Sequence, residues 1–571
     1  MKKTGAEIFW ECMIKEGVEV VFGYPGGVLV PLLDTMLNYP IHHVLVRHEQ
    51  GAAHAADGYA RASGKVGVAI GTSGPGATNL VTGIATAMMD SSPIVCITGQ
   101  VSAPFVGKDA FQEVDITGIT LPITKHNYLV TRAGEIAEVV REAFYIARSG
   151  RPGPVLIDLC KNAMLEETEF IYPDEISLPG YHPPIEPSQD ALKSAAKLIA
   201  EAKRPLILAG HGVLMSGAMN ELREYVEKTQ TPVTMTLLGL GSFPASNIYS
   251  LGMMGMHGEA YANNAIQNAD LIIGMGMRFD DRVTGNLRTY APRARKIHID
   301  IDAAEIQKNV IVDLAILGDL KTVLGDLLPL LEPQQHEEWM DQISEWRSET
   351  EKRDILYHEK EENLLAAHVI RDFWEYTKGN AIVATGVGQH QMWTAQYYHF
   401  DKPNTFITSG GMGTMGFGLP ASVGAWFAHK DKEIWLVDGD GSFQMTQMEL
   451  ATIVQEGANI KILIMNNHFL GMVRQWQELF HDRRYAATVI SGPDFVKLAD
   501  AHGIPGRRVT KNEEVLPALE FAHQTPGPVL IDFHVEREDV VYPMVPAGAD
   551  LDNMLRRPLR QEKNHPTKGK K

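Results

Sequence analysis

The heptapeptide Pro-Gly-Pro-Val-Leu-Ile-Asp occurs twice in this chain of 571 residues, at 152–158 and at 526–532. Each copy follows an amphipathic segment and has the composition of a buried strand. Two further pairs of segments precede it in the same order, each an apolar run followed by a turn: 66–74 with 434–441, and 93–99 with 461–467. Chance similarity between strand and turn sequences could explain the shorter pairs, but the shared order favours duplication. We therefore predict that residues 1–165 and 370–540 are two diverged copies of one doubly wound, parallel α/β fold.

Two segments separate these copies from a third region. Residues 173–187 contain five prolines and read as an extended linker. Residues 332–362 are highly charged but include Trp339, Ile343 and Trp346, which favours a helical connector on the surface. The region between them should form a third α/β domain, with strands at 205–209, 233–236, 271–275 and 296–301. The predicted division is 1–172, 188–330 and 365–545, followed by a C-terminal tail over 546–571.

Polar residues follow two apolar runs of the second copy. Gly439, Asp440 and Gly441 come after one run, and Asn466 and Asn467 come after the other, with a helix predicted over 448–455 between them. The carboxyl ends of neighbouring parallel strands are where such sheets bind ligands. One carboxylate and one amide oxygen suit Mg²⁺ beside a diphosphate, and glycines allow close approach of the backbone. Either piece alone could be an ordinary turn, but the full spacing predicts a metal–diphosphate site.

Composition excludes several classes of protein. A net charge of −18 argues against a nucleic-acid partner, and no apolar run reaches the roughly 18 residues that would span a membrane. Cys12, Cys96 and Cys160 are too few and too scattered for a disulfide framework or a metal cluster. The N-terminal residues lack the apolar core of a signal peptide, so we expect a cytoplasmic enzyme. The basic residues 568–571 should be a frayed end.

The spacing from Gly439 to Asn467 resembles that of the thiamine-diphosphate enzymes. The resemblance implies a magnesium ion held by Asp440, Asn467 and the backbone carbonyl of Phe469. It also implies coenzyme contacts from Gly439, Gly441 and Ser442.

Glu49 lies in Arg-His-Glu-Gln-Gly-Ala, at a strand-to-helix junction of the first copy. By position alone it could equally be an acid that the helix dipole favours. The same resemblance implies that Glu49 faces N1′ of the coenzyme pyrimidine and so promotes removal of the proton from thiazolium C2. Because Glu49 and the metal site belong to different copies, it further implies a site shared between subunits, in a homodimer or a homotetramer.

Seven further segments look like the acetolactate synthase family: residues 22–27, 72–79, 107–113, 278–285, 387–393, 410–416 and 470–476. The resemblance covers residues 5–555 and implies the FAD-containing catalytic subunit of branched-chain amino acid biosynthesis. That subunit decarboxylates pyruvate and joins the product to pyruvate or to 2-ketobutyrate, giving 2-acetolactate or 2-aceto-2-hydroxybutyrate. A separate regulatory small subunit accompanies some members, and the sequence leaves its presence here open.

The resemblance also assigns roles to individual residues. Around the coenzyme it places Val387, Gly388, Gln389, His390, Gly413 and Met415. At the reacting centre it places Gly27, Phe111 and Gln112, and beside the substrate Arg282, Met472, Val473 and Trp476. For FAD it assigns Arg151, Gly210, His257, Arg278, Asp300 and Asp319, although the middle region has no clean Gly-x-Gly-x-x-Gly motif. By composition alone Phe111 and Met415 would be core residues, and the two aspartates would be ordinary acids at the ends of elements. Ser102 departs from the usual proline, which puts herbicide sensitivity in doubt.

Two alternatives stay open at this point. A pyruvate oxidase would have a similar fold and the same two organic cofactors but would use the flavin for redox chemistry. A scaffold that binds coenzyme without catalysis is disfavoured by the presence of Glu49, Asp440 and Asn467. Acceptor preference and the choice between dimer and tetramer are not readable from the sequence.

Overall fold

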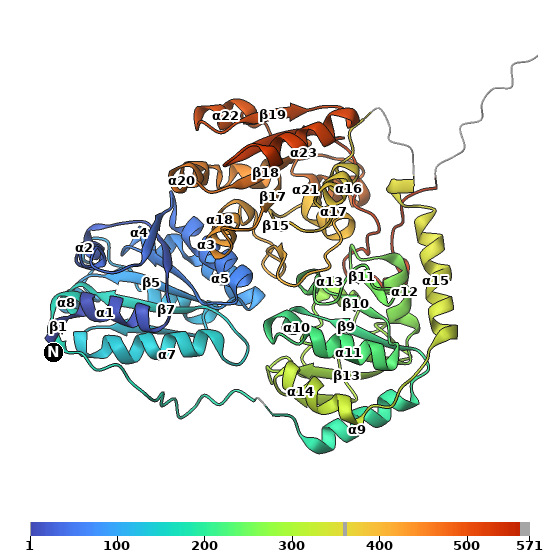
Figure 1. Cartoon of the computed structure of the whole chain (residues 1–571), viewed down its shortest axis with the longest axis horizontal. Helices are drawn as coiled ribbons and strands as arrows, with labels where there is room; N and C mark the ends of the chain where they lie inside the picture. Colours follow the sequence, from blue (N-terminus) through green and yellow to red (C-terminus); the bar gives the residue numbers. More distant parts are fainter. Residues whose placement is uncertain (1, 185, 358–362, 560–571) are drawn as a thin grey trace, which may run out of the picture.

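The computed structural model describes residues 2–184, 186–357 and 363–559. The N-terminal fold, blue and cyan in Figure 1, contains a six-stranded sheet in the order β3-β2-β4-β5-β7-β6, with all neighbours parallel. Its strands are β2 (Val20–Gly23), β3 (His42–Leu45), β4 (Gly67–Gly71), β5 (Ile94–Gln100), β6 (His126–Val130) and β7 (Val155–Cys160). Its helices are α1 (Gly5–Lys15), α2 (Val30–Met36), α3 (Glu49–Ser63), α4 (Pro75–Asn79), α5 (Val81–Asp90), α6 (Ile116–Thr120), α7 (Ile136–Arg148) and α8 (Lys161–Leu165).

The C-terminal fold repeats this arrangement. Its sheet has the order β16-β15-β17-β18-β20-β19, again all parallel, which is the same order of first to sixth strand as in the N-terminal fold. The strands are β15 (Ile382–Thr385), β16 (Phe406–Ile407), β17 (Ile434–Gly439), β18 (Ile460–Asn466), β19 (Gly506–Val509) and β20 (Val529–His534). The helices are α16 (Ala366–Thr377), α17 (Gln389–Tyr397), α18 (Gly418–Ala428), α19 (Asp440–Gln444), α20 (Leu450–Glu456), α21 (Gly471–Phe480), α22 (Phe495–Ala501) and α23 (Val515–Gln524). The two heptapeptides run into equivalent strands, β7 and β20, so the prediction of two diverged copies is confirmed.

The middle fold, green in Figure 1, has the strand order β11-β10-β9-β12-β13-β14, also all parallel. Numbered along the chain this is 3-2-1-4-5-6, the order of dinucleotide-binding sheets. The strands are β9 (Pro205–Ala209), β10 (Val233–Met235), β11 (Ser250–Met253), β12 (Leu271–Met275), β13 (Arg295–Asp300) and β14 (Leu314–Leu317). The helices are α9 (Gln189–Glu201), α10 (His211–Met215), α11 (Met219–Thr229), α12 (Ala260–Asn268), α13 (Asp281–Thr284) and α14 (Leu320–Leu327). All four strands predicted for this region are present.

Helices α3 and α18 lie side by side between the N-terminal and C-terminal sheets and share one hydrophobic core with both (Figure 1). Alanines and glycines line this contact. A Cβ added to Gly58 would lie 2.1 Å from the carbonyl oxygen of Ala421, and one added to Gly424 would lie 1.9 Å from that of Ala55. The two helical backbones are therefore in direct contact, which explains the run of small residues in α3.

The connecting segments differ in part from expectation. Residues 173–184 and 186–187 form neither helix nor strand, as predicted, and Ile185 lies outside the described residues. In the connector, α15 (Glu337–Glu351) is not simply a surface helix, because Trp339 is buried and donates a hydrogen bond to the carbonyl of Pro205 (3.0 Å). Residues 358–362 lie outside the described part. The helix predicted over 448–455 begins as a 3₁₀ turn, Gln447–Glu449, and continues as α20.

The first and last described segments of the chain pack against the folds. An antiparallel pair, β1 (Lys2–Thr4) with β8 (Glu167–Glu169), was not predicted, because three polar residues per strand show no hydrophobic pattern. Residues 546–559 are not a loose tail: Leu551 is buried in the core of the middle fold, and Asp550 accepts a hydrogen bond from Asn286 (2.9 Å). The predicted frayed end at 568–571 lies outside the described residues. The cysteines are buried and unpaired, and within the described residues no helix is long and apolar enough to span a membrane.

Candidate active site

The predicted metal ligands lie together at the carboxyl edge of the C-terminal sheet. Gly439 pairs in register with Met465, so β17 and β18 end side by side and place Asp440 next to the Asn466–Asn467 pair. Asp440 begins α19, and both it and Asn467 are buried. The Asn467 side-chain oxygen accepts the backbone N–H of Phe469 (3.0 Å), which folds this turn back towards the strand end.

The Asp440 carboxyl group lies in a desolvated environment at this edge. Burial raises the pKa of Asp440 to about 7, although hydrogen bonds from backbone N–H groups oppose that rise. A nearby positive charge favours the ionised form of such a carboxylate. Across the described residues no group of three or more His, Cys, Asp or Glu side chains could hold a metal. A metal at Asp440 would therefore draw on amide and carbonyl oxygens, which is the donor set that Mg²⁺ accepts.

Both polar atoms of the Gln389 side chain are hydrogen-bonded within the protein. Its side-chain oxygen accepts a hydrogen bond from Asn467 Nδ2 (3.2 Å). Its Nε2 donates to the side-chain oxygen of Gln475 and to the carbonyl of Asp539, both at 2.9 Å. Gln389 therefore supports the predicted ligand Asn467 from behind.

The segments predicted to surround the coenzyme converge on Ser442. Its hydroxyl oxygen accepts the N–H of Gly416 (3.0 Å) and that of Val387 (3.4 Å). It thereby fixes the relative position of the segments that carry Gly388 and Met415. His390, at the start of α17, is buried 3.4 Å from the carboxylate of Asp438, and burial lowers its pKa to about 3, so the ring is neutral.

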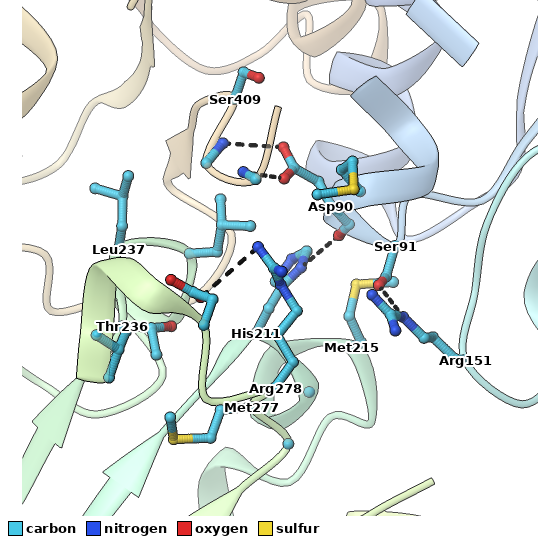
Figure 2. A pocket seen from close by; sticks show the side chains of 18 of the residues that line it. Asp90, Ser91, Arg151, His211, Met215, Thr236, Leu237, Met277, Arg278 and Ser409 are labelled. Carbon is cyan, nitrogen blue, oxygen red and sulfur yellow. Dashed lines mark hydrogen bonds and ion pairs between the residues drawn. The ribbon is translucent and has the colours of Figure 1, made fainter. Parts of the chain in front are cut away.

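A cavity of about 1010 Å³ lies where the three folds meet, and Figure 2 shows part of its wall. It opens beyond the ends of β9 and β12, between which the strand order of the middle sheet reverses, and such switch points bind nucleotides. Thirteen of the predicted site residues line it: Arg151, His257, Arg278, Arg282, Asp300, Asp319, Val387, Gly388, Gly413, Met415, Met472, Val473 and Trp476. The residues predicted for FAD, coenzyme and substrate thus share one continuous space.

The polar residues of this cavity are largely held by neighbours. Arg151 pairs with Glu305 (2.6 Å) and Asp302 (3.2 Å). Asp319 caps α14 by accepting the N–H groups of Lys321 and Thr322. His257 Nδ1 donates to the carbonyl of Pro543 (3.1 Å), and burial lowers its pKa to about 4.

Asp300 and Gly210, which are also predicted for FAD, make contacts with the backbone beside the cavity. Asp300 accepts the N–H of Asp302 (2.9 Å), so one of its oxygens is used to shape the turn after β13. Gly210 packs directly on the backbone of Gly276, and it is the next residues, His211 and Gly212, that reach the cavity.

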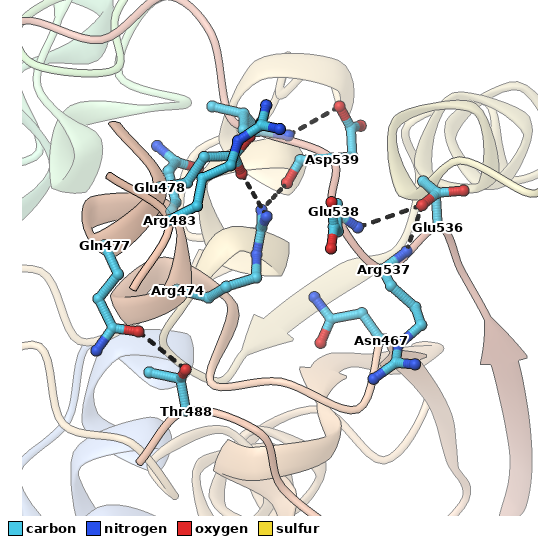
Figure 3. A network of polar contacts seen from close by, with 12 residues as sticks. Asn467, Arg474, Gln477, Glu478, Arg483, Thr488, Glu536, Arg537, Glu538 and Asp539 are labelled. Atoms are coloured by element: carbon cyan, nitrogen blue, oxygen red, sulfur yellow. Dashed lines mark hydrogen bonds and ion pairs between the residues drawn. The ribbon is translucent and has the colours of Figure 1, made fainter. Parts of the chain in front are cut away.

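Helix α21 presents Met472, Val473 and Trp476 to the cavity and is fastened from its buried side. The fully buried Arg474 donates to the carbonyl of Asp539 (2.7 Å) and pairs with Glu478 (2.5 Å), as Figure 3 shows. Because Arg474 fixes the helix, the cavity side chains are held on a rigid element. Arg282, in contrast, is more than half exposed, lies 3.8 Å from the carboxylate of Asp281 and donates to Met256 Sδ (3.5 Å).

Of the site residues predicted in the N-terminal fold, Arg151 lines this cavity, but the four predicted for the coenzyme and the reacting centre do not. Glu49 is buried at the start of α3 and accepts a hydrogen bond from Asn79 (2.9 Å). Phe111 is 86% exposed, and Gly27 is also exposed. Glu49, Gly27, Phe111 and Gln112 are absent from the described lining of the cavity. The chain by itself does not bring them to Met415.

Sequence reasoning missed several residues of the cavity wall. Met89, Asp90 and Ser91 at the end of α5, and His211 at the start of α10, line it (Figure 2). None carries a motif, since an acid at a helix end and a histidine after a strand are common. Only the tertiary structure identifies them.

Comparison with known families agrees with this architecture. Residues 3–119 match the model of the thiamine pyrophosphate enzyme N-terminal TPP binding domain. Residues 192–327 match the thiamine pyrophosphate enzyme central domain. Residues 386–533 match the thiamine pyrophosphate enzyme C-terminal TPP binding domain.

Individual relatives match over nearly the whole chain. The acetolactate synthase large subunit of Corynebacterium glutamicum is 48% identical over 561 residues, covering 96% of this chain and 89% of the relative. The acetolactate synthase of Mycobacterium leprae is 47% identical, covering 96% and 90%. The acetolactate synthase large subunit of Lactococcus lactis is 46% identical, covering 97% and 96%. With three thiamine pyrophosphate enzyme domains and this extent of identity, the chain belongs to the acetolactate synthase family.

Proposed function

We propose that this protein is an acetolactate synthase, which decarboxylates pyruvate and joins the remaining two-carbon unit to a second 2-ketoacid. Pyruvate as acceptor gives 2-acetolactate, and 2-ketobutyrate gives 2-aceto-2-hydroxybutyrate, precursors of the branched-chain amino acids. The observation that carries the proposal is the single cavity that joins the coenzyme segments Val387–Gly388 and Gly413–Met415 to the substrate residues Arg282 and Trp476. A pyruvate oxidase has no specific observation in its favour, and the relatives described above are acetolactate synthases.

The roles of the coenzyme residues follow from their positions. Thiamine diphosphate supplies, when bound, the electron sink that decarboxylation requires. Asp440, Asn467 and the Phe469 carbonyl would hold Mg²⁺ on its diphosphate. Met415, fixed through Gly416 and Ser442, would set the bend between its two rings. Glu49 would hold the proton at the pyrimidine N1′.

FAD is proposed for the part of the cavity formed by the middle fold. The 3-2-1-4-5-6 strand order and a cavity of about 1010 Å³ at its switch point support a dinucleotide. Arg278 of the middle fold, and Arg151, which the N-terminal fold contributes to the same cavity, suit its phosphates. Carboligation moves no net electrons, so the flavin would act structurally. A redox-inert flavin analogue that binds should therefore sustain activity.

A second copy of the chain would complete the site. Glu49 and the exposed loop with Phe111 stand outside the cavity, and Tyr24, Phe105 and Leu121 of the same fold are also exposed apolar side chains. Exposed apolar surface of this kind marks an interface. We therefore assign the N-terminal fold of one protomer to the coenzyme of its partner.

The proposed function is tested with the purified chain, thiamine diphosphate, Mg²⁺, FAD and pyruvate. Release of carbon dioxide with formation of 2-acetolactate, without consumption of an electron acceptor, is the expected result. Adding 2-ketobutyrate should divert product to 2-aceto-2-hydroxybutyrate. Flavin reduction in proportion to the pyruvate consumed would instead establish an oxidase.

A further inference from the structure

Asp90, the last residue of α5, is buried where the three folds meet. Its carboxylate accepts the backbone N–H groups of Gly410 (3.1 Å) and Gly411 (2.6 Å) in the C-terminal fold. Its backbone carbonyl lies 3.0 Å from His211 Nδ1 in the middle fold. Because a carbonyl only accepts, His211 is the donor. One residue of the N-terminal fold thus holds both other folds, as Figure 2 shows.

Arg61 of α3 extends this contact. Its guanidinium pairs with Asp90 (2.7 Å) and with Asp57 (2.6 Å), and it donates to the carbonyl of Thr408 (2.6 Å). All three charged side chains are at most 5% exposed, and hydrogen bonds between charged groups at such distances are strong and directional. The Thr408–Gly411 backbone is therefore held by the N-terminal fold as well as by its own fold, in which Gln391 donates to the carbonyl of Ser409 (2.9 Å).

The fixed segment lies between the two proposed cofactor sites. It leads directly to Gly413 and Met415, and the hydroxyls of Thr414 and Thr86 are 2.7 Å apart. On its other side Ser91, next to Asp90, accepts a hydrogen bond from Arg151 Nε (2.8 Å). Arg151 and His211 both line the cavity. Arg151 and His211, which would touch a flavin, are thus hydrogen-bonded to Ser91 and Asp90. Asp90 in turn holds the backbone of residues 410–411, which leads to the proposed coenzyme site.

We propose that Asp90 is a positioning residue that couples occupancy of the flavin cavity to binding of thiamine diphosphate. The inference rests on the proposed function. A dinucleotide in the cavity fixes Arg151 and His211, and the Asp90 carboxylate passes that restraint to the backbone that carries Gly413 and Met415. By linkage each cofactor then raises the affinity for the other by the same factor. This accounts for a flavin requirement in a reaction that moves no net electrons.

Neighbouring glycines supply a matched pair of variants. A Cβ at Gly411 would lie 2.8 Å from the Asp90 carboxylate and 3.1 Å from the carbonyl of Met89, so Gly411→Ala should disrupt the contact. The three atoms nearest to a Cβ at Gly410, at 2.7 to 3.1 Å, all belong to the branched end of the Leu238 side chain, which would have to shift. Gly410→Ala is therefore the control. Asp90→Asn keeps the shape but weakens both N–H contacts and the pairing with Arg61.

The experiment measures binding without turnover. Full-length apoenzyme is titrated with thiamine diphosphate and Mg²⁺, with and without saturating FAD, and binding is followed by tryptophan fluorescence. In a second titration FAD is added to apoenzyme with and without saturating thiamine diphosphate and Mg²⁺. In the wild type and in Gly410→Ala, FAD should lower the Kd of thiamine diphosphate by about fivefold or more, the lower end of common coupling between sites. In Gly411→Ala and Asp90→Asn the change should fall to within about twofold, while each cofactor alone still binds. Thermal unfolding of each apoenzyme checks that it is folded.

Undiminished coupling in the folded Gly411→Ala and Asp90→Asn variants would overturn the inference. So would wild-type enzyme that binds both cofactors independently. If one variant does not fold, the other decides, and Thr86→Val, which leaves every buried charge paired, decides if neither folds. The outcome is separate from that of the proposed function, because wild-type enzyme that makes 2-acetolactate without coupling refutes only this inference.

Discussion

At the scale of single residues, the site divides groups that would touch reactants from groups that hold them. Gln389 has both amide atoms engaged by Asn467, Gln475 and Asp539, so it acts through Asn467. Glu49 is buried, and its carboxylate accepts one hydrogen bond, from Asn79. A carboxylate has two acceptor oxygens, so Glu49 can still bind a further partner. The proposed role of Glu49 in proton transfer can therefore be tested by substituting this residue alone.

Glu49→Gln should lower turnover by about 100-fold or more, the scale of a lost acid–base group. The amide keeps the size and the contact with Asn79 but cannot hold a proton at the pyrimidine N1′. Turnover is measured at saturating thiamine diphosphate, so that weaker binding does not obscure the effect. Turnover close to wild type under these conditions would remove Glu49 from proton transfer.

Trp476→Leu should lower the preference for 2-ketobutyrate over pyruvate as acceptor by roughly tenfold, since one methylene in an apolar pocket is worth about 1–3 kcal/mol. Trp476 lies on the cavity side of α21, and its ring contacts Phe480 (5.3 Å between centroids). Both acceptors compete in one vessel, and the product ratio is measured. Loss of both products in parallel would mean that the tryptophan only packs the helix.

At the scale of elements, the carboxyl ends of β17 and β18 determine where the metal should bind. Two adjacent asparagines follow β18, yet their partners differ. Asn466 donates to Asp532 (3.0 Å) in the neighbouring strand β20, whereas Asn467 donates to Gln389 (3.2 Å). Alternation along a strand end thus sends one amide into the sheet and the other into the site.

Asp440→Ala and Asn467→Ala should each raise the concentrations of Mg²⁺ and thiamine diphosphate needed for half-maximal activity by at least about tenfold, as expected for a lost metal contact. Asn466→Ala is the control and should change thermal stability without changing those concentrations. Activation curves with and without added metal provide the measurement. Superimposable curves for wild type and Asp440→Ala would place the metal elsewhere.

The equivalent strands β7 and β20 begin within the same heptapeptide, but the aspartate of that heptapeptide has different partners in the two strands. Asp532 pairs with Arg508 and His534, whereas Asp158 receives only hydrogen bonds, from Thr98 (2.8 Å) and Gln100 (2.9 Å). Burial raises the pKa of Asp158 to about 7. The folded chain therefore retains this proton at pH values where the unfolded chain releases it.

Stability contributed by this proton is full below the ordinary pKa of 3.8 and is lost as pH rises towards about 7. Asp158→Asn has no such proton. The midpoint of thermal unfolding of the variant, relative to wild type, should therefore increase between pH 5 and pH 8. The free energy of unfolding of the wild type, relative to the variant, should fall by at most about 1.4 kcal/mol per pH unit. A difference that does not vary with pH would contradict the assignment.

At the scale of the whole molecule, the proposed shared site predicts complementation. Glu49→Gln and Asp440→Ala damage different folds, so a mixed dimer would contain one doubly damaged site and one intact site. Random assembly of equal amounts should restore about a quarter of wild-type activity at limiting Mg²⁺ and thiamine diphosphate, where each variant alone has little activity. Co-expression with two affinity tags isolates the mixed dimer. No recovery in that species would mean that each site is built within one chain.

The sequence predicted some of this organisation and not the rest, for physical reasons. Buried parallel strands are continuous apolar runs with characteristic turns, so the duplicated folds and the middle strands were readable, as were Asp440 and Asn467 at their ends. The dinucleotide order of the middle sheet was not, because no glycine motif marks it. Asp90 and His211 were also missed, since their importance comes from three folds meeting in space. The packing of residues 546–559 on the middle fold was not predicted, because this segment has no regular hydrophobic pattern.

The backbone contact between α3 and α18 has a consequence for motion. Helices this close share a buried hydrophobic core with both sheets, and separating them would expose that core to water. The N-terminal and C-terminal folds of one protomer should therefore move as a single rigid body. Opening and closing during turnover is then left to short segments at the rim, such as the exposed loop with Phe111, so the catalytic cycle would be gated by loops rather than by domains.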